Sequence, residues 1–363
     1  MAIMRSILIT GNMGYVGPCL VEYLRCQYPN ARLIGLDSGF FASSLLPGQS
    51  LPERALDVQY FQDMREPFGS ILSEVEAVVH LAAISNDPMG NSYQEVTESI
   101  NHEATIRFAR AARKAGVGRF VFASSCSVYG FAEEGARTEQ SDVNPLTAYA
   151  RSKVACETSL RELGSEDFIV TCLRFATACG SSPRLRLDLV LNDFVASAVS
   201  SRRIHILSNG MPWRPLIAVE DMARATHWGL TRKSVDGGVF LIVNAGSNVW
   251  NYQVHELASV VAEIIPGTEV QVNREAASDN RSYRVDFSLF SSLALGYQPE
   301  ATLERVIVNL RNLLESSGFR DSNFRSSSLM RLNLLSSLVA SGELTSDLIW
   351  QPRKHSLTDF QTI

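Results

Sequence analysis

The chain has 363 residues, of which 45% are hydrophobic and 20% are charged. This composition is typical of a globular protein that buries a full core, in one large domain or two smaller ones. With 33 basic against 38 acidic residues and no long basic run, the sequence argues against a nucleic-acid-binding surface.

The sequence also lacks signals for membrane insertion, secretion and metal binding. No apolar run approaches the roughly 20 residues that cross a bilayer, and the amino terminus does not have the pattern of a signal peptide. The six cysteines form no Cys-x-x-Cys pair and lie near no histidine cluster, which indicates reduced thiols. We therefore expect a cytoplasmic protein with no membrane partner and no metal site.

Short apolar runs alternate with helical periodicity through the first half of the chain. Strands that are buried on both faces and alternate with helices predict an α/β fold with a parallel, doubly wound sheet. The expected strands are residues 6–10, 32–36, 58–61, 77–81, 120–124 and 169–173, and the expected helices are 14–27, 92–115 and 146–163.

From about residue 176 the alternation becomes irregular, and we interpret much of the second half as a smaller α/β substrate lobe interleaved with the sheet domain. The expected elements are helices near 219–230, 254–264 and 302–314 and a strand at 239–244. The predicted division is 1–176 with 215–246 for the sheet domain, 177–214 with 247–318 for the lobe, and 319–363 for a helical tail.

The tail is rich in serine and leucine, and Leu329, Leu332, Leu335 and Val339 recur near helical spacing. An amphipathic helix that packs on the body or on a partner subunit would explain this pattern. A surface helix followed by a frayed tail is the simpler interpretation, and it is the one we prefer from the sequence.

Three glycines, Gly11, Gly14 and Gly17, follow the first strand and open a helix. Their spacing allows a tight turn and a close approach of the backbone to a pyrophosphate at the helix amino terminus. Asp37 ends the second strand, where a carboxylate can bind the ribose hydroxyls of adenosine. The same carboxylate would repel a 2′-phosphate, and no arginine follows it in residues 38–40, so NAD is favoured over NADP.

Tyr149 and Lys153 carry the catalytic signal. Residues four apart on a helix share a face, so the phenol and the ammonium can converge on one point. A free tyrosine has a pKa of about 10, and a nearby lysine cation would lower the pKa of Tyr149 toward that of a useful general base. Beside a nucleotide-binding loop, the pair indicates an enzyme of alcohol–ketone redox chemistry.

Further motifs follow in order along the chain. They are Phe61-Gln62-Asp63-Met64, His80-Leu81-Ala82-Ala83, Asn101, a strand end through Ser124-Ser125-Cys126, and Trp213-Arg214-Pro215. Together with the glycine loop and the Tyr149 motif, they resemble the extended short-chain dehydrogenase/reductase family over about residues 5–315. Within that family, the nucleotide-sugar epimerases and dehydratases are the most similar, and UDP-glucose 4-epimerase is the type that the chain resembles.

The resemblance implies a Rossmann fold, NAD as cofactor, a nucleotide-diphosphate sugar as substrate, a homodimer, and Ser125, Tyr149 and Lys153 as catalytic residues. The implied cofactor contacts are Gly11, Asn12, Met13, Gly14, Tyr15, Val16, Gly17, Asp37, Asp63, Met64, Leu81, Ala82, Ala83, Asn101, Tyr149 and Lys153. The implied substrate contacts are Ser85, Ser125, Cys126, Thr177, Asn192 and Arg214.

The chain departs from the family's pattern in several places. The 4,6-dehydratases carry an Asp-Glu pair directly after the catalytic Ser or Thr, and Cys126 and Ser127 occupy those positions here. Thr177 stands where an asparagine often contacts the substrate. Cys126 is either a weak acid or base beside the sugar or, as we prefer, a small buried packing residue. Arg184 and Arg186 are either diphosphate ligands or solvated loop charges.

The sequence therefore predicts an NAD-dependent nucleotide-sugar epimerase that acts at C4 through a transient 4-keto sugar. Two alternatives stay open. One is a reductase or oxidase of a nucleotide 4-ketosugar that uses the same three catalytic residues. The other is a catalytically idle NAD-binding subunit that serves assembly.

Overall fold

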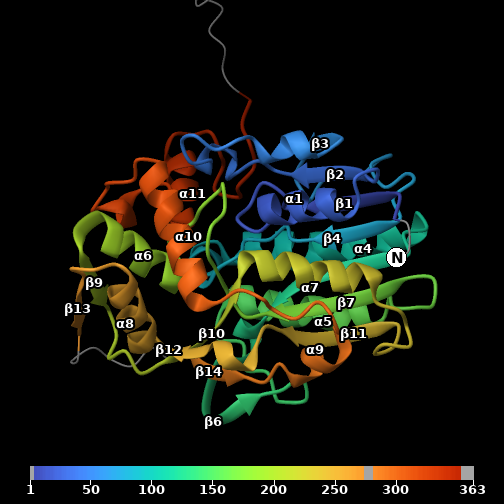
Figure 1. The fold of residues 1–363 in the computed structure, drawn as a ribbon. Helices are drawn as coiled ribbons and strands as arrows, with labels where there is room; N and C mark the ends of the chain where they lie inside the picture. Colours follow the sequence, from blue (N-terminus) through green and yellow to red (C-terminus); the bar gives the residue numbers. More distant parts are fainter. Residues whose placement is uncertain (1–3, 274–280, 353–363) are drawn as a thin grey trace, which may run out of the picture.

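The computed structural model describes residues 4–273 and 281–352. Its centre is a sheet of seven parallel strands in the order β11-β7-β5-β4-β1-β2-β3 (Figure 1). The chain starts in the middle of the sheet and winds outward in both directions, which is the Rossmann arrangement that the sequence predicted. The strands are β1 (Ser6–Thr10), β2 (Arg32–Asp37), β3 (Val58–Phe61), β4 (Ala77–His80), β5 (Arg119–Ser125), β7 (Ile169–Phe175) and β11 (Phe240–Ala245).

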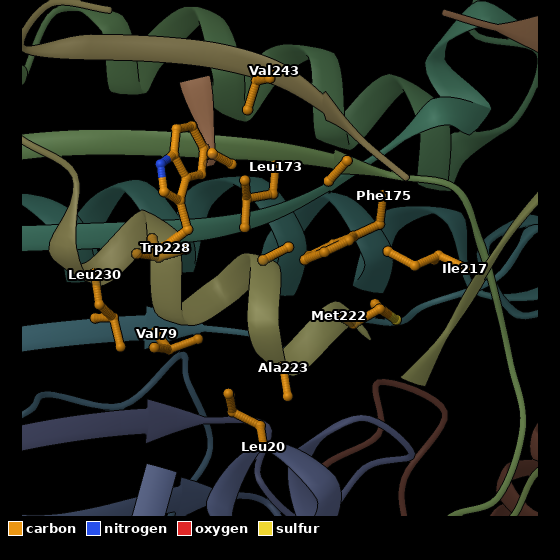
Figure 2. Packing of buried hydrophobic residues seen from close by; sticks show 14 of the residues in the cluster. Leu20, Val79, Leu173, Phe175, Ile217, Met222, Ala223, Trp228, Leu230 and Val243 are labelled. Atoms are coloured by element: carbon orange, nitrogen blue, oxygen red, sulfur yellow. The ribbon is translucent and has the colours of Figure 1, made fainter. Parts of the chain in front are cut away.

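Successive side chains of a strand point to opposite sides of the sheet, so the apolar strands present an apolar surface on each face. Helices cover both of these faces. Ile7 and Ile9 pack toward α1 (Gly17–Gln27) and α7 (Val219–Thr231), whereas Leu8 packs toward the opposite layer. That layer contains α4 (Thr105–Lys114) and α5 (Ala148–Arg161). Figure 2 shows the first face, where α7 packs on the sheet through side chains such as Trp228 and Met222, and Leu20 of α1 lies next to it.

The helix predicted over residues 92–115 is interrupted. It consists of α3 (Gln94–Glu98), a π-helical turn η3 (Ser99–Ala104) and α4, and it is preceded by a short α2 (Asp87–Ser92). Single π turns of this kind are frequent at functional sites. Here the turn contains Asn101, whose side chain binds the loop that follows β4.

After β7 the chain builds a second hydrophobic cluster from α6 (Val190–Ser201), α8 (Val254–Ile264) and α10 (Leu303–Ser316). Helix α6 was not predicted, because it is buried along most of its length and so lacks a one-sided apolar stripe. The short strands were also not predicted. They are β6 (Phe131–Arg137), β8 (Thr177–Cys179), β9 (Arg203–Ile206), β10 (Trp213–Ala218), β12 (Asn251–Gln253), β13 (Glu269–Val272) and β14 (Ser282–Val285).

These short strands form three small sheets. β10 lies between β8 and β12, β13 pairs with β9, and β14 pairs with β6. The remaining short elements are α9 (Ser288–Leu293), η1 (Ala42–Ser44), η2 (Pro52–Ala55), η4 (Cys126–Tyr129), η5 (Asn248–Trp250) and η6 (Phe324–Ser326). In the part of the chain that the structure describes, no helix has the length and hydrophobicity needed to span a membrane.

Residues 319–352, which we call the C-terminal arm, contain η6 and α11 (Arg331–Ala340). The arm lies beside the chain that follows β2 (Figure 1), where Leu335, Leu344 and Leu348 pack against Phe40 and Met89. For the described part of the tail, the structure therefore favours the other interpretation, in which the helix and the chain after it pack on the body. Residues 353–363 of the predicted tail lie outside the described residues.

Candidate active site

A cavity of about 770 Å³ opens where the central strands end. Its wall includes Gly11 after β1, Asp37 at the end of β2, Ala82 after β4 and Ser125 at the end of β5. In open parallel sheets, ligands bind at this edge, at the point where the strand order reverses. The volume lies in the upper part of the usual range for small-molecule sites.

The glycine loop needs glycine for two different reasons. Gly11 has a φ of +71°, and a Cβ there would lie 2.6 Å from the Ala82 nitrogen. A Cβ on Gly17 would lie 2.1 Å from the Asn12 oxygen, so this glycine permits close packing inside the loop. α1 then begins with no side-chain cap and no acidic residue in its first turn, which leaves its first amides able to bind an anion.

Asp37 lies at the adenosine end of the predicted cofactor site. Its carboxylate accepts hydrogen bonds from the Met13 amide at 2.9 Å and the Gly39 amide at 2.7 Å. Burial raises the pKa of Asp37, and the two amides offset part of that rise. A carboxylate has about four acceptor positions, so the oxygens of Asp37 can still accept from ribose hydroxyls.

The rest of the predicted cofactor surface lies on the same cavity. Asp63 belongs to it, and its carboxylate is paired with Arg65 at 2.7 Å. The uncapped helix, the acceptor at Asp37 and the size of the cavity together fit a dinucleotide. The predicted cofactor residues that line the cavity are Gly11, Gly14, Tyr15, Val16, Asp37, Asp63, Met64, Leu81, Ala82, Ala83, Tyr149 and Lys153.

The three predicted catalytic residues also meet on this cavity. Ser125 ends β5, while Tyr149 and Lys153 lie in α5, whose first residues are capped by the Thr147 hydroxyl. The Ser125 hydroxyl lies close enough to the Tyr149 phenol to lower the pKa of that phenol. The Lys153 ammonium lies 5.5 Å from the centre of the Tyr149 ring and donates to the Ala123 carbonyl at 2.7 Å.

The expected effect of Lys153 on Tyr149 differs from what the structure shows. Burial raises the pKa of Tyr149 to about 12, and the nearby Ser125 hydroxyl and the cation of Arg186 only partly oppose this. Burial also lowers the pKa of Lys153 to about 8. In the protein alone, desolvation outweighs the groups that favour the phenolate, so the pKa of Tyr149 lies above its ordinary value instead of below it.

Several predicted cofactor contacts lie behind the cavity wall. The Asn12 amide donates to Gln59 at 2.6 Å, and Gly17 packs on Asn12. Met13 is buried, and its amide is bound to Asp37. Asn101 accepts from the Ile84 amide at 2.8 Å and donates to the Ile84 carbonyl. These residues shape the wall through their neighbours.

Two predicted substrate contacts are likewise absent from the cavity wall. Cys126 is 1% exposed, its thiol points to the Arg174 carbonyl at 3.1 Å, and burial raises its pKa. Asn192 is fully buried, accepts from the Gly180 amide and donates to the Tyr15 hydroxyl. The preferred reading of Cys126 as a packing residue fits this position, and Asn192 has the structural task of holding Tyr15.

The other predicted substrate residues, Ser85, Thr177 and Arg214, do line the cavity. The charged residues there that no sequence motif indicated include Asp87 and Arg281, which form an ion pair at 3.0 Å. Neither belongs to a local motif. Only the clustering of charged residues near Tyr149 in the folded chain reveals them.

Arg184 and Arg186 are not solvated loop charges. Arg184 is 1% exposed and pairs with Glu53, while Arg186 is 6% exposed, lines the cavity and pairs with Asp188. Arg186 also donates to the Ser85 hydroxyl at 3.2 Å. Both guanidinium groups therefore belong to the buried surroundings of the cavity.

Comparison with known proteins agrees with this arrangement. The chain is 28% identical to UDP-glucose 4-epimerase 1 of Oryza sativa subsp. japonica over 250 residues, which are 65% of this chain and 66% of that protein. It is 25% identical to dTDP-D-glucose 4,6-dehydratase of Mus musculus over 286 residues, 77% of this chain and 78% of that protein.

Among solved structures, MoeE5 in complex with UDP-glucose and NAD is similar, with a TM-score of 0.70 and 26% identity, covering 86% of this chain and 99% of that one. Residues 7–246 match the model of the NAD-dependent epimerase/dehydratase family. With its glycine loop and its Ser125, Tyr149 and Lys153 on one cavity, the chain belongs to the NAD-dependent epimerase/dehydratase family.

Proposed function

We propose that this family member is a nucleotide-sugar epimerase that inverts C4 of its substrate through a transient 4-keto sugar. One observation supports this most. Ser125, Tyr149 and Lys153 meet on one cavity, while the two positions of the dehydratase carboxyl pair hold a buried thiol, Cys126, and a hydroxyl, Ser127. Neither group is an obvious acid or base for an elimination.

In the proposed reaction, Tyr149 and Ser125 both act on the 4-hydroxyl of the sugar. Tyr149 takes the proton of the 4-hydroxyl and later returns it, and Ser125 donates a hydrogen bond to the same oxygen. When bound, NAD would supply reversible hydride transfer at C4, which the inversion of that carbon requires. Lys153 would bind the nicotinamide ribose, and Asp37 would bind the adenosine ribose.

The substrate diphosphate would bind on the side of the cavity formed by β10 and the start of β14. Arg214 lies in β10 and lines the cavity, as does Arg281, which directly precedes β14. Guanidinium groups suit diphosphates because their planar donors match phosphate oxygens. In this proposal, residues 177–214 and 247–318 form the substrate lobe.

A second candidate function is elimination, as in the family's dehydratases. It would require a carboxyl group at the sugar, and Asp87 lines the cavity close enough to Tyr149 to affect its pKa. However, Asp87 accepts a hydrogen bond from the Thr147 hydroxyl at 2.6 Å and is paired with Arg281. These contacts favour a positioning role for Asp87.

A substrate panel tests the proposal. The protein is incubated with UDP-, GDP-, CDP- and dTDP-sugars, while the reduced-nicotinamide absorbance, the product mass and the configuration at C4 are followed. We expect a change of configuration with no net NADH and no change of mass. Loss of water would indicate a dehydratase, and net NADH formation or consumption would indicate an oxidase or reductase.

If no sugar reacts although NAD binds, the idle assembly subunit becomes the better interpretation. The expected homodimer is a separate prediction, which sedimentation of the purified protein tests. The expected cytoplasmic location is also a prediction, and cell fractionation tests it.

A further inference from the structure

Three buried arginines lie together beside the glycine loop. Arg184 and Arg186 come from the chain after β8, and Arg331 is the first residue of α11 in the C-terminal arm. Arg331 is 1% exposed. Burying a guanidinium group is costly unless its charge and its donors find partners.

The charges of the first two arginines have such partners, although the Nε of Arg184 is buried without a hydrogen-bond partner among the described residues. Arg184 makes two hydrogen bonds to Glu53, at 2.6 and 3.0 Å, and Arg186 makes two to Asp188, at 2.7 and 3.1 Å. The carboxylates in this group are therefore already engaged.

Arg331 is paired differently. Its Nη2 donates to the Arg184 carbonyl at 2.9 Å, and its guanidinium lies 4.5 Å from the centre of the Phe41 ring. Within residues 4–273 and 281–352, its Nη1 is buried without a hydrogen-bond partner. Burial and the nearby Arg186 lower the pKa of Arg331 to about 9. A guanidinium in these surroundings strongly favours an anion.

The position of Arg331 indicates which anion this is. Arg331 lines the same cavity as Gly14 and Tyr15, and Tyr15 is among the groups that act on its pKa. These residues directly precede the uncapped start of α1. The arginines proposed for the substrate diphosphate form a separate group, in which Arg214 contacts the Arg281 carbonyl and Arg281 pairs with Asp87.

We propose that Arg331 binds the pyrophosphate of the dinucleotide and that the C-terminal arm retains the cofactor in the cavity. This rests on the NAD site of the proposed function, but not on its sugar chemistry. The glycine loop forms one part of the pyrophosphate site, and the arm contributes a cation to it from a distant part of the sequence.

The contacts of the arm explain how it can retain the cofactor. It is attached near its start, where Arg325 pairs with Asp193 at 2.6 Å. It is attached again near Trp350, whose indole donates to the Ser38 carbonyl at 2.6 Å. Arg65, beside Asp63, donates to the carbonyls of the arm at Asp347 and Leu348.

The loops after β2 and β3 are therefore joined to the arm at the adenosine end of the cavity. Cofactor that is held by these loops and by Arg331 exchanges slowly. Slow exchange suits a reaction cycle that regenerates NAD, and it does not suit an oxidase that must release NADH at every turnover.

Binding measurements with Arg331→Gln test the proposal, after bound nucleotide has been removed with charcoal. The probes are NAD, ADP and adenosine, of which only adenosine lacks the diphosphate. We expect NAD and ADP to bind about 10- to 100-fold more weakly, the range for losing a hydrogen bond to a charged group. Adenosine should bind as it does to the wild-type protein, and less NAD should copurify.

Two variants serve as controls. Arg320→Gln removes an exposed arginine of the same arm, whose Nη1 donates to the neighbouring Phe319 carbonyl, and it should bind all three probes normally. Arg331→Lys keeps the charge but loses the planar fork, so it should recover part of the affinity for ADP. Amide exchange in the wild-type arm should slow when NAD or ADP is added, but not with adenosine.

Three results would overturn the proposal. Unchanged NAD affinity in Arg331→Gln would exclude a pyrophosphate contact. An equal loss of ADP and adenosine affinity would show that Arg331 only supports the fold. A higher KM for the nucleotide sugar with normal NAD binding would assign Arg331 to the substrate diphosphate. If Arg331→Gln does not fold, Arg331→Lys and the exchange data on the wild-type protein decide the question.

Discussion

The edge of the central sheet and the C-terminal arm form two parts of the wall of one cavity, but they contribute different properties. The sheet edge and the helix after it present groups that can transfer protons, Ser125, Tyr149 and Lys153, close to one another. The arm presents a buried cation, Arg331, and attaches through apolar packing, contacts to backbone carbonyls and the Arg325–Asp193 ion pair.

The two parts are also positioned differently. Tight backbone geometry fixes the loops at the sheet edge. For example, the Gly11 backbone lies so close to the Ala82 backbone that no side chain fits between them. The arm is fixed by contacts with elements far away in the sequence, such as Ser38 and Asp193. This difference suggests that reaction and cofactor retention can be changed separately, and the following variants test that separation.

Tyr149→Phe should have the largest effect on turnover. The variant loses the transferable proton but keeps the ring, so we expect kcat to fall by about 10²- to 10⁴-fold, the usual contribution of general acid–base catalysis. Copurified NAD should stay at the wild-type level, unlike in Arg331→Gln. Initial rates and the NAD content of the purified protein check this. A rate within a few-fold of wild type would remove Tyr149 from the mechanism.

The same difference between the two regions explains which parts of the fold and of the site could be predicted from the sequence. The seven sheet strands and the residues at their ends were predictable because periodicity and motif spacing are local. Arg331 could not be predicted, since it meets Arg184 across 147 residues of sequence. Asn101 and Asn192 were predicted as ligand contacts from the family resemblance, but only the fold shows that their side chains bind the backbone behind the wall.

Asp37→Ala should have the next largest effect. Asp37 lies at the sheet edge, but its loss should weaken cofactor binding, as the loss of Arg331 in the arm should. We expect NAD binding to lose about 1–3 kcal/mol, because ribose hydroxyls lose a charged acceptor. Discrimination against NADP should also fall, since the carboxylate no longer repels a 2′-phosphate. Titration of both cofactors into both proteins measures this, and equal NAD affinity would place Asp37 outside the site.

The pH dependence of kcat/KM tests whether the reaction needs the Lys153 ammonium. The oxidation step needs the Tyr149 phenolate and, in our proposal, the Lys153 ammonium. Their pKa values are about 12 and about 8 in the structure. Below pH 8 the phenolate fraction rises with pH, so kcat/KM should rise by about tenfold per pH unit. Above pH 8 the loss of ammonium offsets the gain in phenolate, and the profile should level off.

Lys153→Met should change the shape of that profile. Without the ammonium, kcat/KM should start lower and continue to rise above pH 8, and NAD should be retained less well. Rates measured between about pH 6 and 10 provide the comparison. A variant that levels off at the same pH as the wild-type protein would show that another group causes the plateau.

Cys126→Ala should have the smallest effect, although Cys126 directly follows Ser125. The thiol is buried, points to the Arg174 carbonyl, and does not line the cavity. We expect near-normal turnover and normal NAD binding, with a loss of about 1 kcal/mol in unfolding free energy, which is typical of a single substitution. A rate loss of about 10²-fold or more with unchanged folding would instead indicate that the thiol transfers a proton. Cys126→Ser would then recover little activity, because a hydroxyl does not titrate in the range of a thiol, and elimination or epimerisation next to the ketone would become the better interpretation.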